Sequence, residues 1–157
     1  MLSVRKAEPQ DVARLTAIAA AAYSPYVARI GRPPAPLTAD YAAAVAREEV
    51  WVALRDGAVV GLLVLVAEPD HLLLENVAVD PAAQGSGVGT FLLGVAESQA
   101  LQLGRPEIRL YTNAAMTENL AYYPRRGYVE THRGRQDGFD RVYFSKPLPP
   151  GPASTCG

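Results

Sequence analysis

The chain has 157 residues, of which 49% are hydrophobic and 20% charged, and its formal net charge is −1. This length and composition suit one globular domain with a substantial core, and a charge near zero argues against nucleic acid as a general partner. The single cysteine, Cys156, excludes an internal disulfide and favours a reducing, cytoplasmic compartment. The N-terminal residues lack an apolar signal core, and the longest apolar run, 59–67, is far shorter than the roughly 20 residues that cross a bilayer. We therefore expect no membrane segment.

The first part of the chain predicts a strand, a helix, an irregular region and a second helix. Residues 2–5 read as a short strand, and apolar residues recur at helical spacing over 11–22. Four prolines interrupt residues 24–40, which predicts a loop or short helical turns. A second helix over 41–47 would be capped by Thr38 or Asp40.

Three consecutive antiparallel strands and a long helix are predicted next. The β-rich runs 50–54 and 58–67 are joined by Arg55-Asp56-Gly57, and Asp-Gly between such runs is a strong hairpin signal. A turn at 68–70 returns the chain into a third strand, 71–79. A glycine-rich loop then leads into a helix over 87–103, whose expected apolar face is formed by Val88, Phe91, Leu92 and Val95.

The last third of the chain predicts a strand over 107–112, a helix over 116–126 ended by Gly127, and a final hairpin around 136–138. The tail, 149–157, is rich in proline and glycine and is expected to be disordered. The whole order predicts a single α/β domain over 1–148. Its sheet should be mixed, because the long helix returns the chain as a parallel crossover.

The loop between the third predicted strand of this run and the long helix carries three alternating glycines, Gly85, Gly87 and Gly89. Backbone N–H groups at a helix N-terminus favour an anion such as phosphate, and glycines let the backbone approach it closely. A Walker loop would need a lysine before Thr90, and a dinucleotide fingerprint would need a glycine at that position. The alternative is a turn that only lets helix and strand pack closely.

The run Val77–Pro81 followed by Gln84-Gly85-Ser86-Gly87-Val88-Gly89 resembles the central motif of the GCN5-related N-acetyltransferase (GNAT) superfamily. The family pattern is arginine or glutamine, two variable residues, glycine, one variable residue, and glycine or alanine. The segment 119–128 is also similar to the family, with Tyr123 four residues before Gly127. The resemblance extends from the first strand to about residue 148. It implies a central, mostly antiparallel twisted sheet flanked by helices, and transfer of an acetyl group from acetyl-CoA to an amine.

The resemblance also implies a coenzyme site. The diphosphate would lie on the backbone of 84–90, and the pantetheine arm would run beside the strand, where the N–H of Val77 would polarise the thioester. The family often has an asparagine where this chain has Met116, so the pantetheine contact passes to Asn119, with Asn113 at the end of the preceding strand. The implied coenzyme-binding residues are Val77, Ala78, Val79, Gln84, Gly85, Ser86, Gly87, Val88, Gly89, Thr90 and Asn119.

Two residues are implied in catalysis. Glu75, the one acid in the apolar run 71–79, would be the general base that frees the amine. The alternative is that Glu75 faces solvent or forms an ion pair, and His71 is a weaker candidate that is expected to be exposed. Tyr123 would be the general acid that protonates the departing thiolate. The alternative for Tyr123 is a core aromatic whose hydroxyl reaches the surface, a role that is expected of the neighbouring Tyr122.

The acceptor would enter between the early helical region and the last strands. Aromatic and arginine side chains there suit an acceptor with an acidic group, although solvated arginines on a loop are the plainer interpretation. The sequence therefore predicts a small-molecule amine or amino-acid-like acceptor and no metal, with a homodimer left open. Alternatives are a protein or peptide N-acetyltransferase and a non-catalytic acyl-CoA-binding module. The candidate acceptor-binding residues are Tyr23, Tyr26, Arg29, Arg32 and Tyr111, with Tyr41 in the same region.

Overall fold

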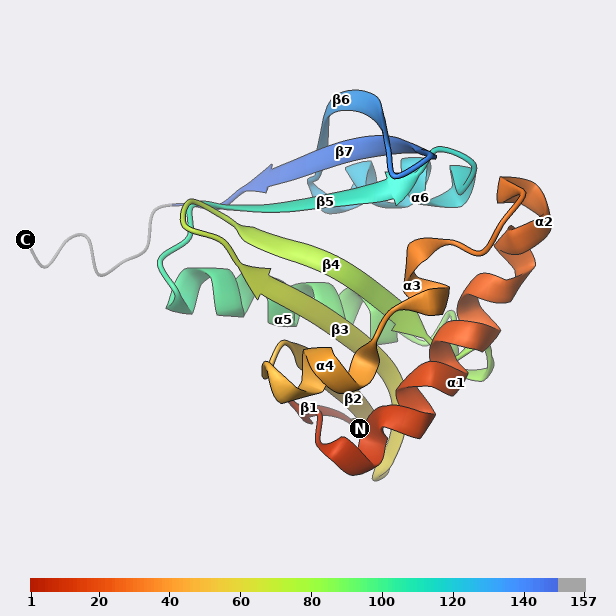
Figure 1. The fold of residues 1–157 in the computed structure, drawn as a ribbon. Helices are drawn as coiled ribbons and strands as arrows, with labels where there is room; N and C mark the ends of the chain where they lie inside the picture. The colour runs from red at the N-terminus through yellow and green to blue at the C-terminus, as the bar shows by residue number, and fades with distance from the viewer. Residues whose placement is uncertain (150–157) are drawn as a thin grey trace, which may run out of the picture. The chain divides into compact units, whose positions relative to one another are not determined.

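The computed structural model describes residues 1–149, so the expected disorder of the tail concerns residues that lie almost entirely outside the described ones. A seven-stranded, mostly antiparallel sheet has the strand order β1-β2-β3-β4-β5-β7-β6 and is accompanied by helices (Figure 1). This confirms the predicted mixed α/β fold. The chain forms two compact units, Met1–Leu65 with Glu75–Gly94, and Val66–Leu74 with Val95–Gly157. Strand β4 and helix α5 each contribute residues to both units.

The first unit begins with the predicted strand and helix and then breaks into short turns. Because its prolines cannot continue a long helix, the region after α1 contains only short helical segments, as predicted. Asp40 caps α4 by accepting a hydrogen bond from the Ala43 N–H at 3.0 Å. The elements here are β1 (Leu2–Lys6), α1 (Val12–Tyr23), α2 (Val27–Ile30), α3 (Ala35–Thr38), α4 (Tyr41–Ala46), β2 (Val50–Arg55), β3 (Ala58–Ala67) and β4 (Leu72–Val79).

The β2–β3 hairpin turns through the predicted Asp-Gly pair. Asp56 and Gly57 have φ values of 52° and 83°, which is the backbone of a two-residue hairpin turn. The strands pair antiparallel from this turn, with Arg55 opposite Ala58. Side chains from α1, α4 and the facing strands build one core cluster, with Leu15 and Ile18 of α1 and Leu62 of β3 among its fully buried members.

Helix α5 (Val88–Gln102) packs its first turns on the other side of β3 (Figure 1). A Cβ built on Gly61 of β3 would lie 3.0 Å from Val88 Cγ1 and 3.1 Å from Leu92 Cδ1. Gly61 thus allows a close approach of the helix to the strand. The predicted apolar face was half wrong. Val88 and Leu92 are buried, but Phe91 and Val95 are half-buried, because the buried stripe continues at four-residue spacing through small side chains, Ala96 and Ala100.

The second unit contains β5 (Glu107–Asn113), α6 (Thr117–Tyr122), β6 (Val129–Gln136) and β7 (Phe139–Pro147). The start of β4 pairs parallel with β5, Leu72 with Ile108 and Leu73 with Arg109, which confirms the predicted crossover. The predicted helix 116–126 was wrong in extent. It ends at Tyr122, and a separate 3-10 turn, Pro124–Arg126, follows because a proline begins a helical turn more readily than it continues one.

Strands β5 and β7 have one buried face and one mixed face, whereas β6 is exposed along its whole length. Ile108 and Leu110 of β5, and Val142 and Phe144 of β7, are buried, and their alternation partners Tyr111 and Tyr143 are half-buried. Antiparallel pairing sets Tyr111 opposite Tyr143 and Asn113 opposite Arg141. The final hairpin turns at Asp137-Gly138, as expected. Within residues 1–149, the helices are all too short or too polar to cross a membrane.

Candidate active site

The glycine loop is an exposed segment immediately before α5. Gly85 and Gly87 have φ values of 81° and 90°, which side-chain-bearing residues rarely adopt. A Cβ added at either position would meet nothing within 4 Å, so glycine is required there by the backbone conformation and not by crowding. Gly89 differs, since it lies within the first turn of α5. The loop therefore presents open backbone at a helix N-terminus, the arrangement that suits an anion.

Two arginines from distant elements hold this loop. Arg55, at the end of β2, donates from Nη1 to Ser86 Oγ at 2.7 Å and from Nη2 to the Ser86 carbonyl at 3.1 Å. Arg14 of α1 contacts Asp80 at 2.5 Å and donates to the Val59 carbonyl. The Ala82 N–H and then Arg14 lower the pKa of Asp80, so this carboxylate stays ionised. Neither arginine was predicted from the sequence.

The middle of β4 is tied to the helices of the first unit by a buried amide. Asn76, 6% exposed, donates to the Tyr41 hydroxyl at 2.8 Å and accepts from the Tyr23 hydroxyl at 2.6 Å. The Tyr23 hydroxyl also lies 3.0 Å from the Val77 carbonyl, and burial raises the pKa of Tyr41 to about 12. Tyr23 and Tyr41, predicted near the acceptor, thus contact the strand that carries Glu75. The sequence contains a pattern that points to Asn76, because an amide within an apolar strand is expected to be buried and then needs hydrogen-bond partners.

The other expected acceptor residues of the first unit lie on its proline-punctuated segment. The Arg29 guanidinium lies 5.0 Å from the centre of the Tyr26 ring, a cation–π contact. Arg29 and Arg32 are both exposed, whereas Tyr26 is half-buried.

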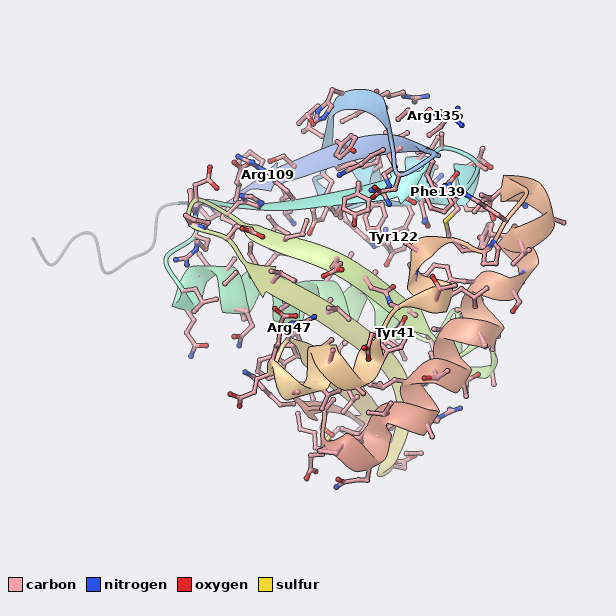
Figure 2. All side chains as sticks on the ribbon, in the orientation of Figure 1. Tyr41, Arg47, Arg109, Tyr122, Arg135 and Phe139 are labelled. Carbon is pink, nitrogen blue, oxygen red and sulfur yellow. The ribbon has the colours of Figure 1, made fainter. Side chains whose placement is uncertain are left out.

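Glu75 lies among charged neighbours in the first unit. Its side chain is exposed to solvent, but the protein around it removes part of the water near the carboxylate, and this desolvation raises its pKa. The nearby Glu49 carboxylate raises the pKa further. Arg47 acts in the opposite direction, and it is bound to Glu49 at 2.9 Å (Arg47 and Tyr41 are labelled in Figure 2). A carboxylate with a raised pKa accepts a proton more readily near neutral pH, which is what a general base requires.

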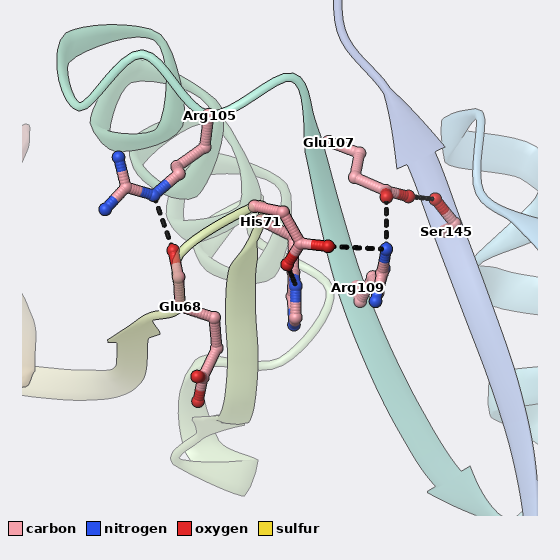
Figure 3. A network of polar contacts seen from close by, with 7 residues as sticks. Glu68, His71, Arg105, Glu107, Arg109 and Ser145 are labelled. Carbon is pink, nitrogen blue, oxygen red and sulfur yellow. Dashed lines mark hydrogen bonds and ion pairs between the residues drawn. The ribbon is translucent and has the colours of Figure 1, made fainter.

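His71, the weaker base candidate, belongs to a polar network at the start of β4. Its Nδ1 lies 2.7 Å from Asp70 Oδ1, and Asp70 is 3.6 Å from Arg109 (Figure 3). Arg109 in turn contacts Glu107 at 2.6 Å, and Ser145 donates a hydrogen bond to the same carboxylate. The His71 side chain is only 16% exposed, so the expectation of an exposed histidine was wrong. The contact of His71 with Asp70 thus joins this histidine to a network of side chains at the start of the strand.

Tyr123 is buried more deeply than its neighbour Tyr122. Tyr123 is 6% exposed and packs against Tyr128 and Phe144, with ring centres 5.6 and 5.9 Å away. Tyr122, expected to be a core aromatic whose hydroxyl reaches the surface, is half-buried, with its ring 5.4 Å from the Tyr123 ring and 3.9 Å from the Arg126 guanidinium. Burial raises the pKa of Tyr123 well above its usual value, so the phenol keeps its proton at any physiological pH.

The amide of Asn119 is oriented by one hydrogen bond. Its Nδ2 donates to Thr112 Oγ1 at 3.0 Å, which turns the amide oxygen the other way and leaves it as an acceptor. Met116, at the position where the family often has asparagine, is buried. Asn113 caps the turn after β5 by accepting from the Ala115 N–H at 2.9 Å. Asn119 is half-buried, whereas the side chain of Asn113 is used by its own turn.

Tyr111 lies half-buried on the mixed face of the second unit. The guanidinium of Arg141 is 4.3 Å from its ring centre, and the Tyr143 ring is 5.9 Å away. Within residues 1–149, no group of three or more His, Cys, Asp or Glu side chains is arranged to hold a metal ion.

Residues 15–128 match the model of the Acetyltransferase (GNAT) family, and the chain belongs to this family. Over 77 residues, 48% of this chain, it is 40% identical to mycothiol acetyltransferase of Jonesia denitrificans, and the match spans 24% of that longer protein.

Two solved structures show the same fold over nearly the whole chain. The ribosomal-protein-S18-alanine N-acetyltransferase of Escherichia coli is 22% identical, with a TM-score of 0.76 and 94% of each chain covered. The PaiA N-acetyltransferase of Thermoplasma acidophilum, in complex with coenzyme A, is 18% identical, with a TM-score of 0.78 and coverage of 94% and 99%. The family supports an acyltransferase activity, and dependence on acetyl-CoA is inferred from it.

Proposed function

We propose that this protein transfers an acetyl group from acetyl-CoA to the primary amine of a small-molecule or amino-acid-like acceptor, by direct attack of the amine. The observation that carries the proposal is the glycine loop, whose left-handed Gly85 and Gly87 leave open backbone at the N-terminus of α5. Such backbone suits the diphosphate of coenzyme A.

The residues fit a coenzyme as follows. Backbone N–H groups of 84–90 would bind the diphosphate, and Arg55 would keep the loop in place through Ser86. The backbone of Val77–Val79 would bind the pantetheine arm, with the Asn119 amide oxygen as a further acceptor. Acetyl-CoA supplies an activated thioester when bound. A backbone donor on β4, the N–H of Val77, would polarise its carbonyl, a contribution of about 3 kcal/mol for comparable donors.

Glu75 would remove the proton from the acceptor amine. An alkylamine with a pKa of about 10.4 is neutral in fewer than about one molecule in a thousand at pH 7, so unassisted attack would be slow. The raised pKa of Glu75 improves its match to this task. Asn76 and its two tyrosine partners would fix the strand immediately after the base.

Tyr123 would donate a proton to the departing thiolate. Burial raises the pKa of this phenol, which keeps it in the protonated form that a general acid requires and also makes it a weaker donor than an exposed tyrosine. Its ring is held by three aromatic neighbours, Tyr122, Tyr128 and Phe144.

The test is thiol release from acetyl-CoA in the presence of amines, amino acids, aminoglycosides and peptides in turn. Release that depends on a small amine or amino acid supports the proposal. Release with peptides alone would replace it by peptide N-acetylation. Tight acetyl-CoA binding without release for any acceptor would favour the acyl-CoA-binding module.

A further inference from the structure

Arg141 of β7 is an arginine buried on the mixed face of the second unit. Its side chain is 7% exposed, and arginines are rarely so buried without a paired charge. Nη1 donates to Gln136 Oε1 at 3.0 Å, a neutral partner. The nearest carboxylate oxygen, from Asp137, is 3.8 Å from Nη1, beyond hydrogen-bond distance, and the Asp137 side chain is 75% exposed.

Aromatic side chains surround this guanidinium. The ring centres of Tyr111 and Phe139 lie 4.3 and 5.6 Å from its central carbon (Phe139 is labelled in Figure 2). The Tyr143 hydroxyl donates to the same Gln136 oxygen at 2.7 Å, which fixes that oxygen between two donors. The His132 ring stacks on Tyr143 with centres 4.2 Å apart and planes within 5°. These side chains form an arginine–aromatic cluster: Tyr111, His132, Gln136, Phe139, Arg141 and Tyr143.

The cluster has unused hydrogen-bonding capacity. A guanidinium has five N–H donors, and in the described residues Arg141 uses one of them on a side-chain oxygen. Burying a cation without a hydrogen-bonded anion is costly, so an anion that completes the pairing is stabilised there. A carboxylate matches the planar fork with two parallel hydrogen bonds. A monoanion also suits the site better than a phosphate dianion, because the Asp137 carboxylate already lies nearby.

We infer that Arg141 binds the carboxylate of the acceptor, so that the substrate class is an amine that also carries a carboxylate, with its apolar part against the rings of the cluster. This inference rests on the proposed function and specifies its acceptor. The arginines that the sequence analysis selected for this purpose, Arg29 and Arg32, are exposed on the first unit. Arg141 was missed because nothing in FDRVYF distinguishes a buried arginine from a solvated one.

The first experiment measures anion binding without turnover. Sodium benzoate and benzamide, which differ in charge but share a ring, are titrated by NMR against the wild-type protein, Arg141→Met and the control Arg135→Met. Arg135 lies on the same hairpin with a 71% exposed side chain (Figure 2). Benzoate binding should weaken about tenfold or more in Arg141→Met and stay unchanged in Arg135→Met, as expected for loss of charge-assisted hydrogen bonds. Equal benzoate binding in all three proteins would overturn the inference.

The second experiment retains the arginine and gives it an internal partner. Gln136→Glu places a carboxylate where the Gln136 oxygen now lies, 3.0 Å from Nη1. This variant should be at least as stable as the wild type and should lose benzoate binding. A purely structural Arg141 predicts the same stability with unchanged benzoate binding, which would count against the site. Because this variant retains the arginine, it remains informative if Arg141→Met does not fold.

The third experiment connects the site to catalysis. Thiol release is measured for amino acids and for their carboxamides. The wild type should favour the acids, and Arg141→Met should remove that preference by raising KM for the acids. If the wild type acetylates acids and carboxamides equally well, the inference fails and the proposed function stands. If no amine supports thiol release but benzoate binding depends on Arg141, the proposed function fails and the carboxylate site stands.

Discussion

The substitution Gly87→Ala tests whether the loop before α5 needs glycine for its backbone. The φ of Gly87 is 90°, and a Cβ there would meet no neighbour within 4 Å, so the only structural cost is the left-handed conformation. That cost is about 1–2 kcal/mol for an L-residue. For a chain of this size it corresponds to a melting temperature lower by about 2–8 °C.

Helix α5, which follows the loop, offers a matched control at Gly94. This glycine lies inside α5, is exposed, and would also place its Cβ in open space. Gly94→Ala should therefore stabilise the protein by about 0.5–1 kcal/mol through helix propensity. Two identical chemical changes seven residues apart thus have opposite expected signs. The free energy of unfolding comes from urea denaturation, and acetyl-CoA affinity from calorimetry.

The expected result is that Gly87→Ala destabilises the protein and weakens acetyl-CoA binding, whereas Gly94→Ala does neither. A further pair, Gly87→Asn and Gly87→Asp, separates shape from charge, because the two side chains are nearly isosteric and both tolerate left-handed backbone. Asp should bind acetyl-CoA about fivefold more weakly than Asn, as expected for an added charge close to an anion in water. Equal stabilities for the two alanine variants would refute the requirement for left-handed backbone at position 87. Equal acetyl-CoA affinities for Asn and Asp would refute the loop as a diphosphate site.

Three other substitutions test the catalytic and structural assignments. Glu75→Gln should lower turnover at neutral pH, with part of the loss recovered at high pH. It should leave the melting temperature equal or higher, since a raised pKa means that the folded protein disfavours the ionised form; an unchanged pH–rate profile would remove Glu75 from the mechanism. Tyr123→Phe should lower kcat by about 10² to 10⁴ with little change in acetyl-CoA affinity, and full activity would contradict its role as the acid. Asp11→Asn removes a bidentate ion pair with Arg5, at 2.7 and 3.1 Å, which lowers the pKa of Asp11. The stability that the ion pair contributes is present above the unfolded pKa of about 3.9 and is lost as pH falls through the lower folded pKa. The difference in melting temperature between Asp11→Asn and the wild type should therefore shrink on acidification. A difference that stays constant with pH would exclude the ion pair as its cause.

The features predicted well from the sequence have local physical causes. Asp-Gly between β-rich runs determined both hairpins, since the left-handed backbone they require is accessible to those residues. Prolines limited residues 24–40 to short helical segments. The parallel crossover followed from the order of elements, because a helix that runs back along the sheet lets the next strand start at the same end as the first.

The features predicted poorly depend on contacts between residues far apart in the chain. Arg55 and Ser86 are 31 positions apart, and nothing near either residue indicates that they bind each other. Asn76 meets Tyr23 and Tyr41 across 53 and 35 positions. Tyr123 is buried and its neighbour Tyr122 only half-buried, at the end of α6, where the regular helical spacing stops before Pro124.

The most direct test of the central claim follows the acetyl group itself. Acetyl-CoA labelled in its acetyl carbon is mixed with a molar excess of protein, with and without an amino acid acceptor, and the products are identified by mass spectrometry. The account predicts that the label appears on the acceptor nitrogen, and that Glu75→Gln slows its appearance without preventing acetyl-CoA binding. Label that remains on coenzyme A, or that is found only in free acetate whether or not the amine is present, would contradict amine acetylation.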